Sequence, residues 1–330
     1  MTPEHPKINY GKTGVLIVNL GTPDSTNWLD IRRYLKEFLS DRRVIEVNPI
    51  IWQIILNLFI LNFRPSKTAK AYKEIWMNDK IMSPLLYYTQ KQAEKISNSF
   101  SKENITIDFA MRYGNPSIKS KIHKFHKMGC ENLVILPLYP QYAAATTATV
   151  CDEVYRTLMK MRWQPSLKII PHYESDQLYI DALVNSINKK INEIGWKPDL
   201  IIASYHGIPK KYFDKGDPYH CYCHKTTRLI SEKFSSIKIK TTFQSRFGPQ
   251  EWLQPYTDKT LESLPKEGVK NVLTICPGFA SDCVETLEEI QIQARESFLN
   301  SGGENFDMVP CLNDNNDHII LLKSLIEKNI

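Results

Sequence analysis

The chain of 330 residues is predicted to be an α/β protein built from two similar, doubly wound domains of the Rossmann-like, three-layer type. Three observations predict this fold class. Short apolar runs alternate with longer amphipathic segments, which is typical of parallel strands covered by helices on both faces. A set of short motifs occurs twice in the same order. The length corresponds to two domains of ordinary size.

The strands are predicted from apolar runs that are rich in Val, Ile and Leu and lack polar alternation, as expected for strands buried on both faces. These runs are 14–20, 105–111, 133–138, 168–171, 200–204, 237–244 and 271–276. The helices are predicted from the amphipathic segments between the runs. These segments are 27–40, 67–76, 84–100, 117–128, 147–161, 175–194, 226–234 and 283–299. Strand–helix alternation of this kind indicates parallel sheets.

Three repeated motifs predict that the two domains are alike. Each motif ends a predicted strand, and the pairs are GVLIVNLGTP with DLIIASYHGIP, AMRYGNP with QSRFGP, and NLVILPLYP with NVLTICPGF. We place the domains at 1–163 and 164–330, with the last helix either in the second domain or packed back on the first. Ligands of such sheets bind beyond the carboxyl ends of the strands, so we expect the motifs to line a cleft between the domains.

Composition excludes several classes of protein. The chain is 42% hydrophobic and 24% charged, as in ordinary globular proteins, and its net charge of +6 is spread along the sequence. No segment resembles a nucleic-acid-binding module. Neither a G-x-G-x-x-G fingerprint nor a P-loop is present, so dinucleotide and nucleoside triphosphate cofactors are unsupported. The seven scattered cysteines indicate a reducing compartment, and we expect a cytoplasmic protein.

Two segments bear on targeting and membranes. The N-terminal stretch MTPEHPKINYGK lacks an apolar core, so no signal peptide is expected. The most apolar segment, PIIWQIILNLFILNF at 49–63, is too short to span a bilayer and is followed by the basic stretch RPSKTAKAYK. This pattern is typical of a surface helix that touches a membrane or an apolar ligand, and peripheral contact with the inner membrane is the alternative to a purely cytoplasmic protein. The oligomeric state is not predicted.

The stretch ASYHGIPKKYFDKGDPYHCYCHK, at 203–225, has the composition of a metal site, with three histidines and two cysteines. A closed zinc site needs four ligands, and a C-x-C spacing without a second cysteine pair is weak support for one. We therefore interpret Cys221, Cys223 and His224 as a loop-to-helix junction with buried thiols. A structural metal held by these residues is the alternative.

His206 directly follows a predicted buried strand, in the tight turn S-Y-H-G-I-P, where its imidazole could bind a transition metal or accept a proton. In the segment CPGFASDCVETLEEI, Glu285 and Glu289 share one helix face and Asp282 lies one turn earlier. Taken alone, acidic residues in a first helical turn complement the helix dipole. Taken with His206, they predict an open histidine–glutamate site for a divalent metal.

The chain resembles the ferrochelatases, which insert Fe²⁺ into a porphyrin to make haem. The motifs that carry the resemblance extend over nearly the whole chain. They are VNLGTP, LSDRRVIE, MSPLLYYT, MRYGNP, LPLYPQYAAATT, SYHGIP, KGDPYHCYCHKT, QSRFGPQEWLQPYT, CPGFASDCVETLEEI and PCLNDN. The resemblance implies a chelatase-like fold of two similar α/β domains with a cleft between them.

The resemblance also implies roles for individual residues. It assigns catalysis and metal binding to His206 and Glu285, and an acidic path to Asp282 and Glu289. The residues that it implies for porphyrin binding are Leu20, Arg112, Tyr113, Tyr142 and Trp252. Arg112 and Arg246 could hold porphyrin propionates, with buried structural pairing as the alternative for Arg246.

Two departures from the family pattern affect cofactors. Cys283 stands where mitochondrial members carry a histidine, so any role of that histidine is absent. Animal members bind a 2Fe–2S cluster with one ligand at the place of Ala144 and the others in a C-terminal extension, whereas this chain has no cysteine after Cys311. We expect no such cluster and no permanently bound cofactor, with Fe²⁺ as a substrate. Other bacterial members place their cluster cysteines differently, which leaves Cys221 and Cys223 as the alternative cluster ligands.

The resulting hypothesis is a lyase of haem biosynthesis that inserts Fe²⁺ into protoporphyrin IX with release of two protons, its partners being porphyrin and iron rather than nucleic acid. Whether His206 first accepts pyrrole protons or first binds iron is left open. Coproporphyrin III is an alternative substrate. Cobalt insertion into sirohydrochlorin would require a more polar pocket. A non-enzymatic haem or porphyrin carrier would not need the acidic row.

Overall fold

The computed structural model of the protein describes residues 9–100 and 104–330. The chain forms two compact units, each described here by itself. The first contains the described residues up to Leu138, with Ala144–Pro171 and Ile319–Ile330. The second contains Tyr139–Ala143 and His172–His318.

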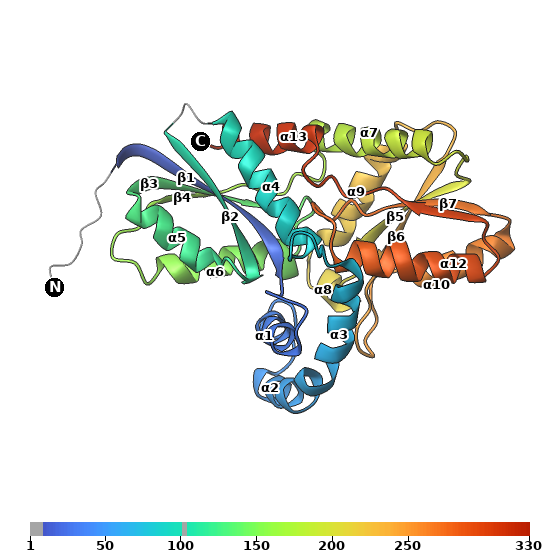
Figure 1. Cartoon of the computed structure of the whole chain (residues 1–330), viewed down its shortest axis with the longest axis horizontal. Helices are drawn as coiled ribbons and strands as arrows, with labels where there is room; N and C mark the ends of the chain where they lie inside the picture. Colours follow the sequence, from blue (N-terminus) through green and yellow to red (C-terminus); the bar gives the residue numbers. More distant parts are fainter. Residues whose placement is uncertain (1–8, 101–103) are drawn as a thin grey trace. The chain divides into compact units, whose positions relative to one another are not determined.

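The first unit is built on a parallel four-stranded sheet with the strand order β2-β1-β3-β4 (Figure 1). Its strands are β1 (Asn9–Thr22), β2 (Ile105–Gly114), β3 (Cys130–Pro137) and β4 (Ser166–Ile169). The central strand β1 pairs Val15 with Ile107 on one side and with Val134 on the other. Residues 15–18 of this strand are completely buried, which explains why its sequence is continuously apolar.

Helices cover both faces of this sheet, with α4 on one face and α5 and α6 on the other (Figure 1). The helices of the unit are α1 (Trp28–Leu39), α2 (Pro49–Ile55), η1 (Leu56–Ile60), α3 (Leu61–Ile75), α4 (Pro84–Ser99), α5 (Ile118–Lys127), η2 (Ala144–Ala148) and α6 (Thr149–Leu158). The carboxyl end of β1 leads into α1, and α2 and α3 lie on the same side of the sheet (Figure 1).

The second unit repeats this arrangement with a parallel sheet in the order β6-β5-β7-β8. Its strands are β5 (Leu200–His206), β6 (Lys238–Gln244), β7 (Asn271–Ile275) and β8 (Asn305–Met308). Its helices are α7 (Gln177–Glu193), α8 (Lys210–Asp214), α9 (Tyr219–Ser231), α10 (Thr257–Ser263), η3 (Leu264–Glu267), α11 (Val284–Thr286), η4 (Leu287–Ala294) and α12 (Arg295–Asn300). The last helix, α13 (Asn316–Glu327), begins in this unit and continues into the first.

The equal strand order of the two sheets confirms the predicted fold class. In each unit the first strand of the repeat is central, the second lies at one side and the third at the other, so each pair of repeated motifs belongs to equivalent strands. A parallel sheet with helices on its faces is what the alternation of apolar runs predicted. Among the described residues, no helix is both long and apolar enough to cross a membrane.

Two local predictions differ from the structure. Strand β8 was not predicted, because its four residues are too few to form a recognisable apolar run. Helix α9 begins at Tyr219, seven residues before the predicted start at 226, so the interpretation of the cysteine–histidine cluster as a loop-to-helix junction was wrong. The whole cluster is helical, with Cys223 buried and Cys221 exposed.

Candidate active site

His206 is the last residue of β5, and the turn after it fixes the state of its imidazole. The Nδ1 atom lies 2.6 Å from the backbone carbonyl oxygen of Gly207. A carbonyl oxygen can only accept a hydrogen bond, so Nδ1 carries the proton and Nε2 presents its lone pair. The side chain is half-buried at the carboxyl edge of the sheet. This histidine is therefore prepared to bind a cation or to accept a proton through Nε2.

The turn requires glycine at position 207. Its N–H donates to the carbonyl oxygen of Gln244 over 2.8 Å. A Cβ atom there would lie 2.9 Å from that oxygen and 3.3 Å from the ring of Trp252. Trp252 is itself buried, and its Nε1 donates to the carbonyl of Phe247 over 2.9 Å. Trp252, predicted to bind porphyrin, thus packs under the His206 turn.

The acidic segment lies where α11 gives way to the π-helix η4. Cys283 caps the segment, because its N–H donates to the hydroxyl of Thr286 over 3.0 Å. Glu285 lies in α11 and Glu289 in η4, and both side chains are half-buried. The π-helix falls within the single helix predicted over 283–299. Its wider turn could not be read from side-chain spacing, and such segments often occur at functional sites.

Asp282 has a different environment from the two glutamates. It is buried, and its carboxylate accepts from the backbone N–H of Cys311 over 3.1 Å and from the side chain of Asn313 over 2.6 Å. The Thr286 hydroxyl is a third donor at 3.3 Å. We call the helix formed by α11 and η4 the acidic helix. These contacts tie Asp282, which lies just before it, to the segment after β8. Its place on an acidic path stays a prediction.

Gln244 connects the histidine to the acidic helix. In the β5–β6 register it is the partner of His206. Its side-chain Nε2 donates to the backbone carbonyl of Glu285 over 2.6 Å. His206 and Glu285 are therefore both neighbours of one buried glutamine. Among the described residues, no group of three or more His, Cys, Asp and Glu is placed to hold a metal ion.

Glu289 has the most perturbed carboxyl group of the acidic segment. Burial in the protein, reinforced by the charge of Glu285, raises the pKa of Glu289 to about 8. The hydroxyl of Ser245 donates to Oε2 of Glu289, which partly opposes that shift. A carboxyl group that changes protonation state near neutral pH is suited to accept or release protons during a reaction.

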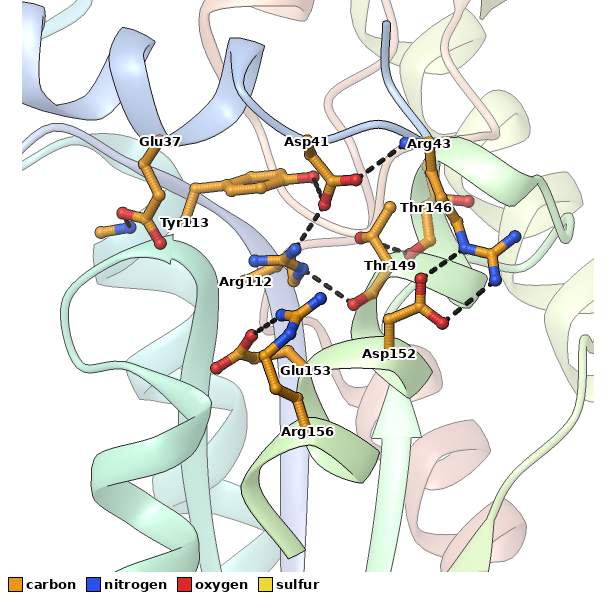
Figure 2. Close-up of polar contacts among 11 residues, drawn as sticks. Glu37, Asp41, Arg43, Arg112, Tyr113, Thr146, Thr149, Asp152, Glu153 and Arg156 are labelled. Atoms are coloured by element: carbon orange, nitrogen blue, oxygen red, sulfur yellow. Dashed lines mark hydrogen bonds and ion pairs between the residues drawn. The ribbon is translucent and has the colours of Figure 1, made fainter. Parts of the chain in front are cut away.

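In the first unit, Arg112 and Tyr113 are held by partners of their own (Figure 2). The Arg112 guanidinium pairs with Asp41, and its Nε donates to the Thr149 carbonyl over 2.8 Å. The same carboxylate accepts from the Tyr113 hydroxyl over 3.0 Å. The Arg112 side chain is only 8% exposed, and burial raises the pKa of Tyr113 above its usual range. This network ties the segment after α1 to β2 and α6.

The other predicted residues lie in varied settings. Leu20, at the carboxyl end of β1, and Tyr142, in the second unit, are half-buried. Arg246 pairs with Asp258, and its guanidinium carbon lies 4.1 Å from the centroid of the Tyr256 ring. Arg246 is exposed, so this is not the buried pairing that was the alternative to a propionate contact, and its contact with a propionate stays a prediction.

An exposed apolar surface is formed by α2, η1 and the start of α3, and we call it the apolar lip. No residue of α2 is buried. The most exposed side chains of the lip are Ile50 at 73% and Phe63 at 75%. Trp52 anchors the lip, because its Nε1 donates to the carbonyl of Leu39 over 2.7 Å. Beside the lip is a cavity of about 560 Å³ whose lining includes two arginines and two acidic residues, with Arg43 paired to Asp152. Lys67 and Lys70, farther along α3, are exposed and form the basic flank of the lip.

Sequence reasoning missed Gln244 and Ser245. Their motif, QSRFGP, was noted only as a strand end that repeats AMRYGNP. A signal was present, since two polar residues stand in the second copy where the first has the apolar pair Ala110 and Met111. What could not be read is the helix they contact, because that contact depends on how the chain folds between residues 245 and 285.

Comparisons with known proteins agree on one family. A family model described as Ferrochelatase matches residues 12–330. A ferrochelatase from Allorhizobium ampelinum is 56% identical over 330 residues, covering 99% of this chain and 96% of the relative. One from Rhizobium meliloti is 54% identical, with coverages of 99% and 97%. The solved structure of SirB from Bacillus subtilis with Fe³⁺ has a TM-score of 0.56 at 11% identity, covering 96% and 95% of the two chains, a likeness in fold alone.

Proposed function

Because the chain belongs to the ferrochelatase family, we propose that His206 and Glu285 form the site at which its reaction takes place. The protein is a lyase of haem biosynthesis that inserts Fe²⁺ into a porphyrin, and both are substrates. The observation that carries the assignment is the hydrogen bond from Nδ1 of His206 to a backbone carbonyl, which leaves Nε2 with a free lone pair. Support for Glu285 comes from the buried Gln244, which contacts its backbone and pairs with His206 in the sheet.

The single lone pair of Nε2 constrains the order of events. It cannot hold a metal ion and a proton at the same time, so His206 acts on iron and on the pyrrole protons in succession. In the proposed sequence His206 and Glu285 first share Fe²⁺ and replace part of its water shell. As iron passes to the porphyrin nitrogens, Nε2 becomes free and takes up the first of the two pyrrole protons, then releases it and takes up the second. Glu289, whose pKa is about 8, passes each of the two protons on toward solvent.

We propose protoporphyrin IX as the porphyrin, and the apolar lip supports this choice. A porphyrin with two carboxylates leaves most of its edge apolar, whereas sirohydrochlorin carries eight. Leu20 and Tyr142, both half-buried, retain accessible surface with which to contact a ring. Arg112, Tyr113 and Trp252 are buried, so we assign them the indirect role of holding the segments around the binding site.

We also propose that the protein works in the cytoplasm, with the apolar lip resting on the membrane surface. Exposed Ile and Phe side chains, followed by the exposed Lys67 and Lys70 of α3, match the chemistry of an anionic bilayer surface. We further propose that it carries no iron–sulfur cluster. In the animal members one cluster ligand falls at the place of Ala144, which has no side chain able to bind iron.

The experiment that tests the site is an anaerobic assay of Fe²⁺ insertion, followed by loss of porphyrin fluorescence, with protoporphyrin IX, coproporphyrin III and sirohydrochlorin in parallel. We expect turnover with protoporphyrin IX. His206→Ala should lower kcat by about 10²- to 10⁴-fold, the usual contribution of a positioned acid–base group. Its Kd for porphyrin should stay within a few-fold of the wild type.

The matched control is His126→Ala, which removes a histidine that packs on Trp163 far along the chain from the site. This control should keep wild-type turnover. Near-normal kcat in His206→Ala would overturn the assignment. Tight porphyrin binding without turnover in the wild type would favour a carrier, and turnover with only coproporphyrin III would correct the substrate.

A further inference from the structure

We propose that Ser245 is a positioning residue for iron delivery, which holds the Glu289 carboxylate in place while its neighbour Gln244 holds the backbone of Glu285. We call this pair the β6 clamp. The inference rests on the function proposed above, because it concerns how the acidic helix is presented at that site. It adds a role for two residues that contact the acidic helix rather than belong to it.

The first argument concerns the direction of the two side chains. Consecutive residues of a strand point to opposite faces of the sheet. Gln244 ends β6, yet Gln244 and Ser245 both reach the same helix, through the Glu285 carbonyl and the Glu289 carboxylate. The backbone at Ser245 makes this arrangement accessible, since its φ of 66° is in the left-handed region and breaks the alternation of the strand.

The second argument is that this backbone is unfavourable for serine. A side chain with a Cβ atom rarely adopts positive φ, and residues held there cluster at functional sites. Among the described residues, only Ile81, Ser245 and Asn313 do so without being glycine. A glycine at 245 would fit the turn without strain, but it would lack the hydroxyl that Glu289 accepts from. Serine therefore keeps an unfavourable backbone conformation at this position, and its hydroxyl hydrogen-bonds to the acidic helix.

The third argument is that Gln244 is rigidly held. Its Oε1 accepts from the hydroxyl of Ser204 on β5 over 2.6 Å, and Ser204 also contacts the Thr257 hydroxyl at 2.8 Å. Its Nε2 is the donor to Glu285. A change from α- to π-helical hydrogen bonding can leave a carbonyl without its helical donor, and Gln244 supplies a donor where α11 meets η4. The clamp thus fixes the acidic helix to the sheet that bears His206.

The fourth argument is electrostatic. Arg246, the residue next to Ser245, pairs with Asp258 and lies over the Tyr256 ring. Its charge is thus engaged by partners other than Glu289. The Ser245 hydroxyl donates to Oε2 of Glu289 and so holds the side chain in one orientation. Because this donor is neutral, it orients the group without adding a positive charge beside it.

The test is Ser245→Gly, which removes the hydroxyl and relieves the left-handed backbone. We expect KM for Fe²⁺ to rise about tenfold, the scale of losing a hydrogen bond to a charged group, with KM for porphyrin and kcat at saturating Fe²⁺ within twofold of the wild type. Binding of Co²⁺ to the porphyrin-free protein, measured by calorimetry, should weaken by a similar factor. Ser245→Asn, which tolerates positive φ and brings an amide donor, should restore part of the affinity.

The matched control is Ile81→Gly, which relieves the same kind of backbone at an exposed position of the first unit. It should leave both KM values unchanged. The clamp is refuted if Ser245→Gly has a wild-type KM for Fe²⁺, or if its KM values for iron and porphyrin rise together. In either case a loss of turnover in His206→Ala would show that the proposed function stands without it. If His206→Ala is fully active, both proposals fail.

Discussion

At the residue scale, the candidate site combines a histidine whose ring orientation is fixed with a carboxyl group whose pKa is raised. The hydrogen bond from Nδ1 of His206 to the Gly207 carbonyl determines which nitrogen reacts. Glu289 differs, because burial and the nearby charge of Glu285 disfavour its ionised form. A reaction that takes in a dication and releases protons uses both features, one group that presents Nε2 in a set direction and one that changes protonation state near neutral pH.

The raised pKa of Glu289 predicts a pH dependence of stability. Its pKa is about 8 in the folded protein against a usual value of 4.5, so between these pH values the folded state binds more protons than the unfolded state. Stability contributed at this position is therefore lost as pH rises from 4.5 to 8. The side chain that Glu289→Gln introduces does not titrate. The Tm of this variant minus the Tm of the wild type should therefore increase by several °C as pH rises from 4.5 to 8, since about 1 kcal/mol moves Tm by ~2–4 °C.

The measurement is thermal unfolding of metal-free protein at a series of pH values. The matched control is Glu296→Gln, at an exposed position of α12, which should follow the wild-type curve. A Tm difference between Glu289→Gln and the wild type that does not change with pH would contradict the prediction.

At the element scale, the long buried strands were predictable, whereas the short strand β8 and the irregular helices were not. The run at 271–276 is apolar throughout and forms β7 at 271–275, because a buried parallel strand requires that pattern. His206 and Glu285 could be proposed because they follow predicted strands. By contrast, the π-helix η4, the early start of α9 and the left-handed Ser245 depend on contacts between distant residues, and no local pattern encodes them. The clamp consists of such contacts.

The apolar lip is also an element-scale feature, and its exposure predicts binding to anionic membranes. Changing Ile50 and Phe63 together to Glu should weaken binding to phosphatidylglycerol vesicles by at least about tenfold, because burying each such side chain is worth ~1.5–3 kcal/mol. Both side chains are more than 70% exposed, at 73% and 75%, so folding should be unaffected. Vesicle co-sedimentation measures the effect.

Ile320→Glu is the control for the lip, since Ile320 is an exposed apolar residue of α13, outside it. This variant should bind vesicles like the wild type. Equal binding by the lip variant and the wild type would show that the lip does not contact the membrane.

At the scale of the whole molecule, the distribution of cysteines predicts a protein without an iron–sulfur centre. Of the seven free thiols only Cys221 is exposed, while Cys130, Cys223, Cys276, Cys283 and Cys311 are buried. Protein purified without oxygen should contain less than about a tenth of an equivalent of acid-labile sulfide, since a cluster needs thiolate ligands. Stoichiometric sulfide, with the visible absorption of a cluster, would contradict this. Protein-bound Fe²⁺ without sulfide would be consistent with the prediction, because iron is a substrate.

The equal strand order of the two sheets has a consequence for where the chemistry lies. In the repeated motifs Leu20 stands where His206 stands, near the carboxyl end of the central strand of each sheet. The register partner of His206 is Gln244, whereas Leu20 lies between Asn19 and Gly21, whose partners are Met111 and Tyr113. Sheets of one strand order thus carry an apolar side chain at this place in one unit and an imidazole in the other, and the first sheet is an internal reference that lacks the imidazole.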